Sequence, residues 1–412
     1  MNEAQTEINI PHLFRCPISL DLLEDPVTLI TGQTYDRSNI EKWISAGNFT
    51  CPVTMQKLHD LSFVPNHTLR HLIDQWLQLG SQYNLSSNNS ATIDYLASLK
   101  NNLVSHDSTL ETKLKTLEKI KVLSDEYCSF RKSCFQQLSF LSLLLELVFG
   151  LCLSDSKLSE KCLEFVELTL SCILKLLPIV NLEPLNIIKD ESKLENFIFL
   201  FENGTSSIKT SLCLVIDYST TVSQTEDLCH VLGNSQKLVH EIVQVVVNQN
   251  SDYDDDGEVS MAAIKALSAL SSLESNKESL VKGGAIDGII TYISRCENGQ
   301  KMNLAPLAMA TLKKLLVLES GKEALVNHVN GIETLVKMVF KVCNQECSES
   351  AVGILSIVCS DFGIAREVAI GAGVLSQLLF LLQSQCGTKT KTKARMLLKL
   401  LRSKWSEESM QL

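Results

Sequence analysis

Apolar residues recur with two different patterns along the chain, and the change between them divides the sequence. Residues 11–80 hold short apolar runs broken by proline, whereas from residue 91 apolar positions recur at helical spacing with little interruption. The stretch 81–90, SQYNLSSNNS, is mostly polar and predicts a linker without regular structure. We therefore expect a flexible tail over residues 1–10, a small domain over 11–80 and a larger domain over 91–412.

The small domain is predicted to contain a β-hairpin and two helices. Two β-prone runs, 27–30 and 34–35, flank a turn that contains Gly32. A helix is expected from about Asp36, where Ser38 and Glu41 fit a capping box ahead of an apolar stripe. A second helix should follow Pro65, capped by Asn66 or Thr68. Its apolar stripe comprises Leu69, Leu72, Ile73, Trp76 and Leu77.

The larger domain contains internal repeats. Similar segments include Ala263, Ala308, Ala351 and Ala394, at successive spacings of 45, 43 and 43 residues, and we expect each to start a helix. In the first three units a small residue follows before a further apolar helix at Ile286, Ile332 or Val374. This period is typical of armadillo repeats, in which each three-helix unit leaves an apolar face for its neighbour to cover. The repeats are clearest over 259–404, and three or four divergent repeats are expected upstream.

The amino-acid composition limits the classes of protein to which this chain can belong. The 412 residues carry a formal net charge of −10 and only 6% are aromatic, which favours helices and argues against nucleic acid as a partner. No apolar run is long enough to span a bilayer, and the N-terminus does not resemble a signal peptide. The fourteen cysteines occur singly and do not form a disulfide framework. We expect a cytoplasmic protein that is not an integral membrane protein, with the nucleus or the membrane surface as alternatives.

A zinc-stabilised fold is excluded by the ligands available in the small domain. Two zinc ions would need eight ligands, mostly in closely spaced pairs, and the chain has no CxxC motif. The candidates number six: His12, Cys16, Cys51, His59, His67 and His71. Although His67 and His71 stand four residues apart on a predicted helix, we interpret them as polar positions beside its apolar stripe. No metal or cofactor is expected.

The small domain resembles a U-box. Six blocks carry the likeness in order: Leu13–Asp21, Asp25–Thr28, Gly32–Arg37, Ile40–Ile44, Cys51–Thr54 and Val64–Arg70. A U-box has the fold of a RING finger with polar side-chain contacts in place of zinc, which agrees with the missing ligands. The resemblance makes five residues candidates for that polar network: Asp21, Glu24, Asp25, Asp36 and Arg37. With the repeats, the whole chain resembles the plant U-box/armadillo ubiquitin ligases. The fold class is mainly α, with a small α+β U-box before an α-solenoid.

The resemblance implies an E3 ubiquitin ligase that acts by positioning rather than through a covalent intermediate. Such a ligase binds a ubiquitin-charged conjugating enzyme (E2) in a shallow apolar groove. The matching positions here are Ile18, Leu20, Trp43 and Pro52. The two loop cysteines, Cys16 and Cys51, are then structural and not nucleophiles. No catalytic triad or phosphate-binding loop offers another chemistry.

One position departs from the family pattern. Many such ligases carry a basic residue three positions after the proline of the second loop, where this chain has Met55. Methionine cannot donate the hydrogen bonds of an arginine. Either Lys57 takes over this role or the conjugate is activated less strongly, and both readings stay open. A non-catalytic armadillo scaffold with a weakened U-box is the alternative function.

Other partners follow from the resemblance alone. The armadillo groove is expected to hold a protein substrate, in a plant a regulator of stress or immune signalling, and a homodimer through the U-box is a further option. Basic residues gather in the last repeat: Lys389, Lys391, Lys393, Arg395, Lys399, Arg402 and Lys404. We interpret them as the polar outer face that a terminal repeat needs, with binding of acidic partners or phospholipid as the alternative.

The acidic run 252–257 lacks the glutamate that would complete a calcium loop.

Overall fold

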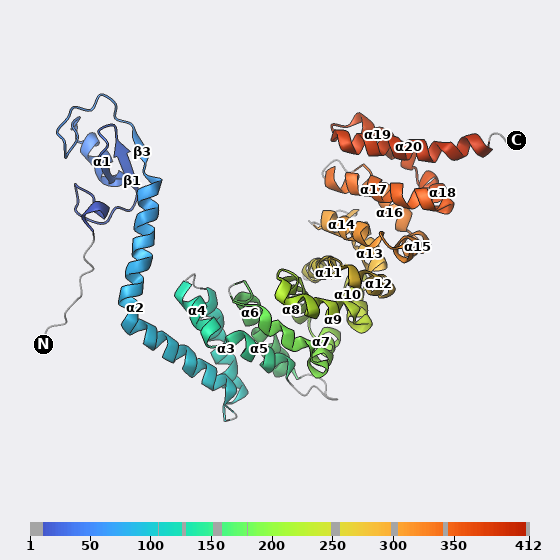
Figure 1. Ribbon diagram of the computed structural model, residues 1–412, viewed down its shortest axis with the longest axis horizontal. Helices are drawn as coiled ribbons and strands as arrows, with labels where there is room; N and C mark the ends of the chain where they lie inside the picture. The colour runs from blue at the N-terminus through green and yellow to red at the C-terminus, as the bar shows by residue number, and fades with distance from the viewer. Residues whose placement is uncertain are drawn as a thin grey trace. The chain divides into compact units, whose positions relative to one another are not determined.

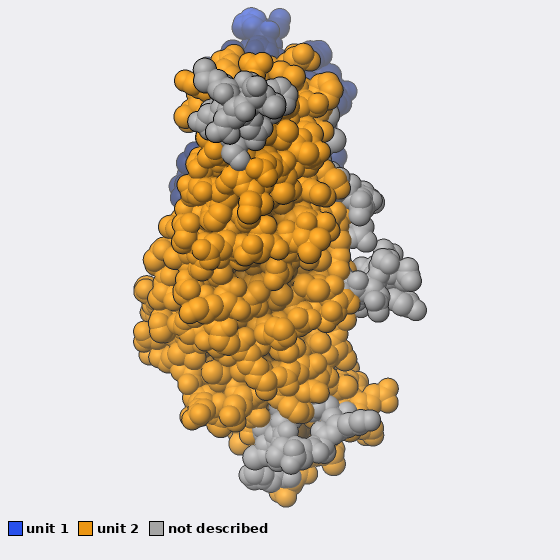
Figure 2. Space-filling model, turned by 90° about the vertical axis from the view of Figure 1, so that its right-hand side faces the viewer, with its two compact units in different colours: residues 1–97 blue, residues 98–412 orange. Residues whose placement is uncertain are grey.

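The computed structural model describes residues 11–105, 107–125, 129–150, 159–178, 180–248, 256–297, 304–340 and 345–408. The chain forms two compact units, residues 1–97 and 98–412, which are coloured separately in Figure 2. The predicted tail over residues 1–10 and most of the acidic run 252–257 lie outside the described residues.

The first unit is built around a three-stranded antiparallel sheet in the order β2-β1-β3. Its strands are β1 (Pro26–Leu29), β2 (Thr34–Asp36) and β3 (Phe63–Pro65). The predicted hairpin is confirmed: Thr28 pairs with Thr34, and the φ of Gly32 in the turn is 78°. The third strand was not predicted, because a three-residue strand that ends in proline has neither the length nor the alternation of a strand pattern.

Two helices accompany the sheet, one after β2 and the other after β3, and a short 3₁₀ turn, η1 (His12–Phe14), precedes β1. The first, α1 (Arg37–Ser45), has Asp36 as its N-cap, and not Ser38 as the capping-box pattern predicted. The second, α2 (His67–Val104), is capped by Asn66, whose Oδ1 accepts the amide of Leu69 at 3.0 Å. The backbone of α2 stays helical through residues 81–90, where the polar composition had predicted no regular structure.

The core of this unit is small and contains both loop cysteines. Its buried members are Cys16, Leu23, Val27, Leu29, Tyr35, Ile40, Cys51, Leu58 and Ile73. The predicted stripe of α1 faces this core, since Ile40 is buried and Trp43 and Ile44 pack partly buried against it. On α2, Ile73 is buried but Leu72 is 49% exposed, so only part of the predicted stripe on α2 lies inside.

The second unit is a solenoid of helices that follow one another in three rows (Figure 1). The first row comprises α4 (Ser129–Gln137), the 3₁₀ helix η2 (Glu183–Lys189), α9 (Glu226–Asn234), α12 (Lys277–Lys282), α15 (Glu319–Asn327) and α18 (Gly363–Gly371). The second comprises α5 (Phe140–Phe149), α7 (Glu191–Asn203), α10 (Gln236–Val247), α13 (Ala285–Glu297), α16 (Gly331–Met338) and α19 (Val374–Gln383).

The third row comprises α3 (Leu110–Asp125), α6 (Glu160–Leu176), α8 (Ser206–Ser219), α11 (Asp256–Leu270), α14 (Ala305–Leu315), α17 (Gln345–Asp361) and α20 (Thr388–Glu408). Each of these helices packs against the next one in the row. Two short 3₁₀ turns, η3 (Ser223–Thr225) and η4 (Glu274–Asn276), precede α9 and α12.

The repeat landmarks coincide with features of this packing. The four alanines that mark the period, Ala263, Ala308, Ala351 and Ala394, are all fully buried in helices of the third row. Each of those helices begins before its alanine, so the alanines mark helix interiors and not helix starts as expected. At the second landmark, Gly284 and Gly373 precede α13 and α19 with φ of 85° and 84°, a backbone conformation that favours glycine.

Among the described residues, no single helix is long and apolar enough to cross a bilayer. Helices α18 and α19 have that length and composition only when taken together, and the pair is bent by 72°. The apolar segment that begins at Phe140 forms α5, in which six residues are buried.

We predict that Gly233→Ala destabilises the solenoid by about 1–3 kcal/mol, the usual effect of overpacking. A Cβ at Gly233 would overlap the Asn276 carboxamide, which is fully buried and donates to the carbonyls of Cys229 (3.0 Å) and Leu270 (3.2 Å). Urea unfolding, combined with hydrogen exchange of α9, measures the loss.

Gly353→Ala is the matched control, because a Cβ there meets no atom within 4 Å and the residue lies inside α17. Alanine in a helix interior should raise stability by about 0.5–1 kcal/mol. Equal effects of the two substitutions would contradict the packing role of Gly233.

Candidate functional site

The first loop of the U-box region, residues 16–21 (CPISLD), closes on itself through backbone hydrogen bonds. The amide of Cys16 donates to the carbonyl of Asp21 at 2.8 Å, and the amide of Leu20 donates to the carbonyl of Cys16 at 2.8 Å. Leu20 has a φ of 64°, the left-handed conformation that this tight loop requires. Its side chain consequently projects outward and is 66% exposed.

The second loop, residues 51–56 (CPVTMQ), repeats this geometry. The amide of Cys51 donates to the carbonyl of Gln56 at 2.9 Å, and the amide of Met55 donates to the carbonyl of Cys51 at 2.9 Å. Met55 has a φ of 58° and is 72% exposed, so it occupies the place that Leu20 has in the first loop. The unit therefore presents two equivalent loop ends, each with an exposed aliphatic side chain.

Helix α1 ties both loops together through residues one turn apart. Asn39 Nδ2 donates to Ser19 Oγ in the first loop at 3.1 Å. Trp43 Nε1 donates to the carbonyl of Thr50, next to the second loop, at 2.9 Å. Because residues i and i+4 lie on the same helix face, the two loops are fixed beside one face of α1. The Trp43 ring is partly buried and packs against the core.

The two cysteine thiols accept hydrogen bonds inside the core. Cys51 Sγ accepts from Thr31 Oγ1 at 3.4 Å and lies 3.1 Å from the hydroxyl of Tyr35. Burial opposes ionisation, but the hydrogen bonds from Thr31, Thr54 and Tyr35 outweigh it and lower the pKa of Cys51 to about 6. Cys16 Sγ accepts from the amide of Asp36 at 3.4 Å and from Asn39. Both thiols are fully buried, so neither is accessible as a nucleophile.

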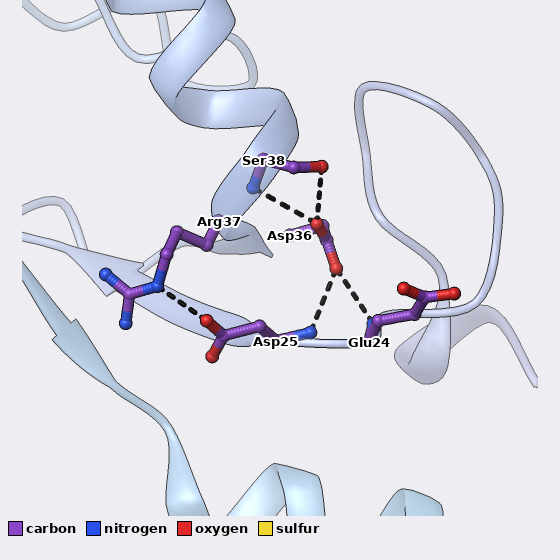
Figure 3. Close-up of polar contacts among 5 residues, drawn as sticks. All are labelled: Glu24, Asp25, Asp36, Arg37 and Ser38. Carbon is purple, nitrogen blue, oxygen red and sulfur yellow. Dashed lines mark hydrogen bonds and ion pairs between the residues drawn. The ribbon is translucent and has the colours of Figure 1, made fainter.

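A buried carboxylate organises the start of α1 (Figure 3). Asp36 Oδ2 accepts the amides of Glu24 (2.8 Å) and Asp25 (3.0 Å), while Oδ1 accepts the amide (3.2 Å) and hydroxyl (2.9 Å) of Ser38. Burial would raise the pKa of Asp36, but these hydrogen bonds outweigh it and hold the pKa below its ordinary value. Beside it, Arg37 Nε forms an ion pair with Asp25 Oδ2 at 2.5 Å.

The predicted polar network is only partly a network of side chains. Asp25, Asp36 and Arg37 contribute their side chains, whereas Glu24 is tied in through its backbone amide. Asp21 contributes its carbonyl, and among the described residues its carboxylate has no hydrogen bond or ion pair. Sequence reasoning missed Asn39 and Tyr35, which hold the loops. No local pattern marks either residue, because their side chains contact segments 16 to 20 residues away in the chain.

The residues predicted to bind a partner differ in exposure. Ile18 packs partly buried against the core, Pro52 is half-buried, and Leu20 is exposed. Met55 and Lys57 are both exposed. Among the described residues, no group of three or more histidine, cysteine or acidic side chains could hold a metal ion.

Comparison with known protein families assigns both units. Residues 10–82 match the U-box domain, and residues 96–411 match the plant U-box protein ARM repeat region. The chain belongs to the plant U-box/armadillo family. U-box domain-containing protein 25 of Arabidopsis thaliana is 30% identical over 97% of this chain and 93% of its own length. E3 ubiquitin-protein ligase PUB23 of the same plant is 28% identical over 97% and 95%.

We predict that Asp36→Asn destabilises this U-box by about 2–4 kcal/mol at neutral pH, since it weakens a helix cap and removes a charged acceptor of four hydrogen bonds. The folded-state pKa of Asp36 is depressed. Its contribution is therefore full above the unfolded pKa of about 4 and is lost as the pH falls through the folded value. The difference in unfolding free energy between wild type and Asp36→Asn should therefore narrow as the pH falls.

Urea unfolding followed by Trp43 fluorescence, in a chain with Trp76 and Trp405 replaced by phenylalanine, measures this difference. Asp21→Asn is the matched control, because that carboxylate is exposed and makes none of these contacts. If the difference in unfolding free energy between wild type and Asp36→Asn is the same at pH 7 and pH 3, the role of the Asp36 charge is refuted.

Proposed function

We propose that this U-box protein is an E3 ubiquitin ligase that binds ubiquitin-charged E2 through its U-box and recruits substrates through its armadillo repeats. Two relatives that align with this chain over nearly their whole length, PUB23 and PUB22, are named E3 ubiquitin-protein ligases. The observation that carries the proposal is the pair of equivalent loops, which α1 holds together with their aliphatic ends exposed.

The proposed E2-binding surface consists of Ile18 and Leu20 from the first loop, Trp43 from α1 and Pro52 from the second loop. A partly exposed tryptophan with aliphatic neighbours has the composition of a protein-binding hot spot. Asn39 and the Trp43 indole N–H fix the two loops before a partner arrives. A surface ordered in this way loses little conformational entropy on binding.

The reaction needs no covalent bond to the ligase. The amine of a substrate lysine attacks the carbonyl carbon of the E2–ubiquitin thioester, an isopeptide bond forms, and the E2 cysteine leaves as the thiolate. The ligase raises the rate by holding the thioester near the lysine. The burial of Cys16 and Cys51 supports this route, because a relay through either thiol would require an accessible sulfur.

Met55 and Lys57 define how strongly the conjugate is activated. Met55 stands where the resemblance to RING and U-box ligases implies a basic residue, and its side chain is exposed. Lys57 lies just beyond the loop and is also exposed. We propose that Lys57 supplies the positive charge near ubiquitin. The alternative, a non-catalytic armadillo scaffold, rests on Met55 alone.

Leu20→Ala should reduce the initial rate of autoubiquitination about ten-fold, the effect of removing one hot-spot side chain worth about 1.4 kcal/mol. Because Leu20 is exposed, the substitution should leave the unfolding midpoint of the U-box unchanged. The assay uses the full chain with ubiquitin, activating enzyme and an E2 of broad specificity.

Ile30→Ala is the matched control for Leu20→Ala. Ile30 is equally exposed, at 67%, but belongs to the turn between β1 and β2 and to neither loop. The E2-binding surface is wrong if Ile30→Ala and Leu20→Ala slow the reaction equally. No ubiquitin chains from the wild type would support the scaffold alternative.

Met55→Arg should accelerate discharge of the E2–ubiquitin conjugate onto free lysine by about three- to ten-fold, since arginine adds charge-assisted hydrogen bonds. Met55→Leu is the control, because leucine already occupies the equivalent position of the first loop. Lys57→Ala should slow the wild type but have little effect in the Met55→Arg background. Single-turnover discharge measures each rate, and equal rates for Met55→Arg and Met55→Leu would contradict the assignment.

A further inference from the structure

The last four helices of the third row, α11, α14, α17 and α20, share a surface without acidic residues. We define the basic face by four corresponding segments, one from each of these helices. Each segment runs from the second to the ninth residue after the landmark alanine of its repeat: residues 265–272, 310–317, 353–360 and 396–403. None of the four segments contains aspartate or glutamate, although the chain as a whole has a net charge of −10. The four helices follow one another in the solenoid (Figure 1).

Lysines recur on the basic face at related positions. Lys313 and Lys399 both stand five residues after their buried alanine, and both are exposed. Lys265 and Lys314 add two partly exposed charges, and Lys314 Nζ reaches across to Ser272 Oγ of the preceding repeat at 3.2 Å. Within the described part of the chain, no ion pair involves Lys265, Lys313 or Lys399.

Acidic residues beside the basic face compensate part of its charge. Glu349, one turn before the face on α17, forms an ion pair with Lys393 at 2.7 Å, and Asp361, just beyond it, pairs with Lys322 at 2.6 Å. Glu258 and Glu346 lie on the first turns of their helices, outside the face. Asp217 of α8 interacts electrostatically with Lys265, and Glu349 also interacts with Lys313. Four lysines of the face are thus set against two acidic neighbours, one of which also pairs with Lys393, and the face keeps a net positive charge.

Between the lysines the face is formed by small and aliphatic side chains. Ala310, Gly353, Ser356 and Ser360 present little bulk, and Val317 and Met396 are 66% and 65% exposed. A polypeptide backbone can approach such a surface closely, and its acidic side chains can reach the lysines on either side.

We propose that the basic face binds an extended acidic peptide segment of the protein that the armadillo repeats recruit. Packed helices lie about 8–10 Å apart, so Lys313 and Lys399, with α17 between them, are separated by roughly 16–20 Å. An extended chain rises about 3.3 Å per residue. The segment consequently carries acidic residues about five or six positions apart. This assignment rests on the proposed recruiting role of the repeats and specifies the chemistry of what they recruit.

Fluorescence anisotropy with the full chain tests the proposal. The probe is a labelled fifteen-residue Gly/Ser peptide, with Val at its centre and pairs of Glu six residues apart. The comparison peptide has Gln in place of Glu. The acidic peptide should bind, its affinity should fall as salt is raised, and the Gln peptide should bind at least ten-fold more weakly.

Two double variants locate the site. Lys313→Ala with Lys399→Ala should weaken binding of the acidic peptide at least ten-fold. Lys237→Ala with Lys282→Ala, which removes two exposed lysines of the other rows that pair with Glu202 and Glu278, should change it less than two-fold. Equal losses in the two double variants, or no binding by the wild type, would overturn the proposal.

Two further measurements distinguish binding of an acidic peptide from membrane binding and from a failure of the ligase function. Sedimentation with vesicles containing phosphatidylserine should show no dependence on Lys313 and Lys399, whereas vesicle binding through these lysines without peptide binding would identify a membrane face instead. Autoubiquitination should be unchanged in the Lys313/Lys399 variant. Active ligase without peptide binding therefore rejects only the acidic segment, while inactive wild type with intact peptide binding rejects only the ligase function.

Discussion

The carboxylate of Asp36 joins three parts of the U-box: the segment before β1, the end of β2 and the start of α1. It accepts the amides of Glu24 and Asp25, which lie between the first loop and β1, and it caps α1 through Ser38. Asp36 is also the last residue of β2, so the sheet, the loop and the helix meet at one side chain. The core cluster of this domain has nine buried members among the described residues, and in so small a core such a carboxylate supplies order that the hydrophobic effect alone does not.

The loops depend on this arrangement in turn. Asn39 and Trp43 can hold both loops only if α1 starts in the right register, and the Asp36 cap sets that register. The backbone amide of Asp36 also donates to the thiol of Cys16, at the start of the first loop. One residue thus fixes both the helix that carries the proposed E2-binding tryptophan and the loop that carries Ile18 and Leu20.

Which of these structural features the sequence could predict depended on how far apart in the chain the interacting residues lie. The hairpin, both U-box helices and the repeat period follow from local patterns and were predicted. The third strand and the true cap of α1 were missed, because pairing with β1 and the approach of Glu24 and Asp25 to Asp36 are contacts between distant segments. Asn39 carries no pattern of its own, so its hydrogen bond to Ser19 required the structure.

The equivalence of the two loops has a consequence for Met55. Both loops need a left-handed residue at the same place, and both leave its side chain exposed, yet one uses leucine and the other methionine. The backbone hydrogen bonds that close each loop involve no side chain at this position. The fold therefore places no demand on the residue type at position 55 beyond tolerance of a positive φ. The choice between an aliphatic and a basic side chain is left to whatever the loop end contacts, which in the proposed complex is the E2 and its ubiquitin.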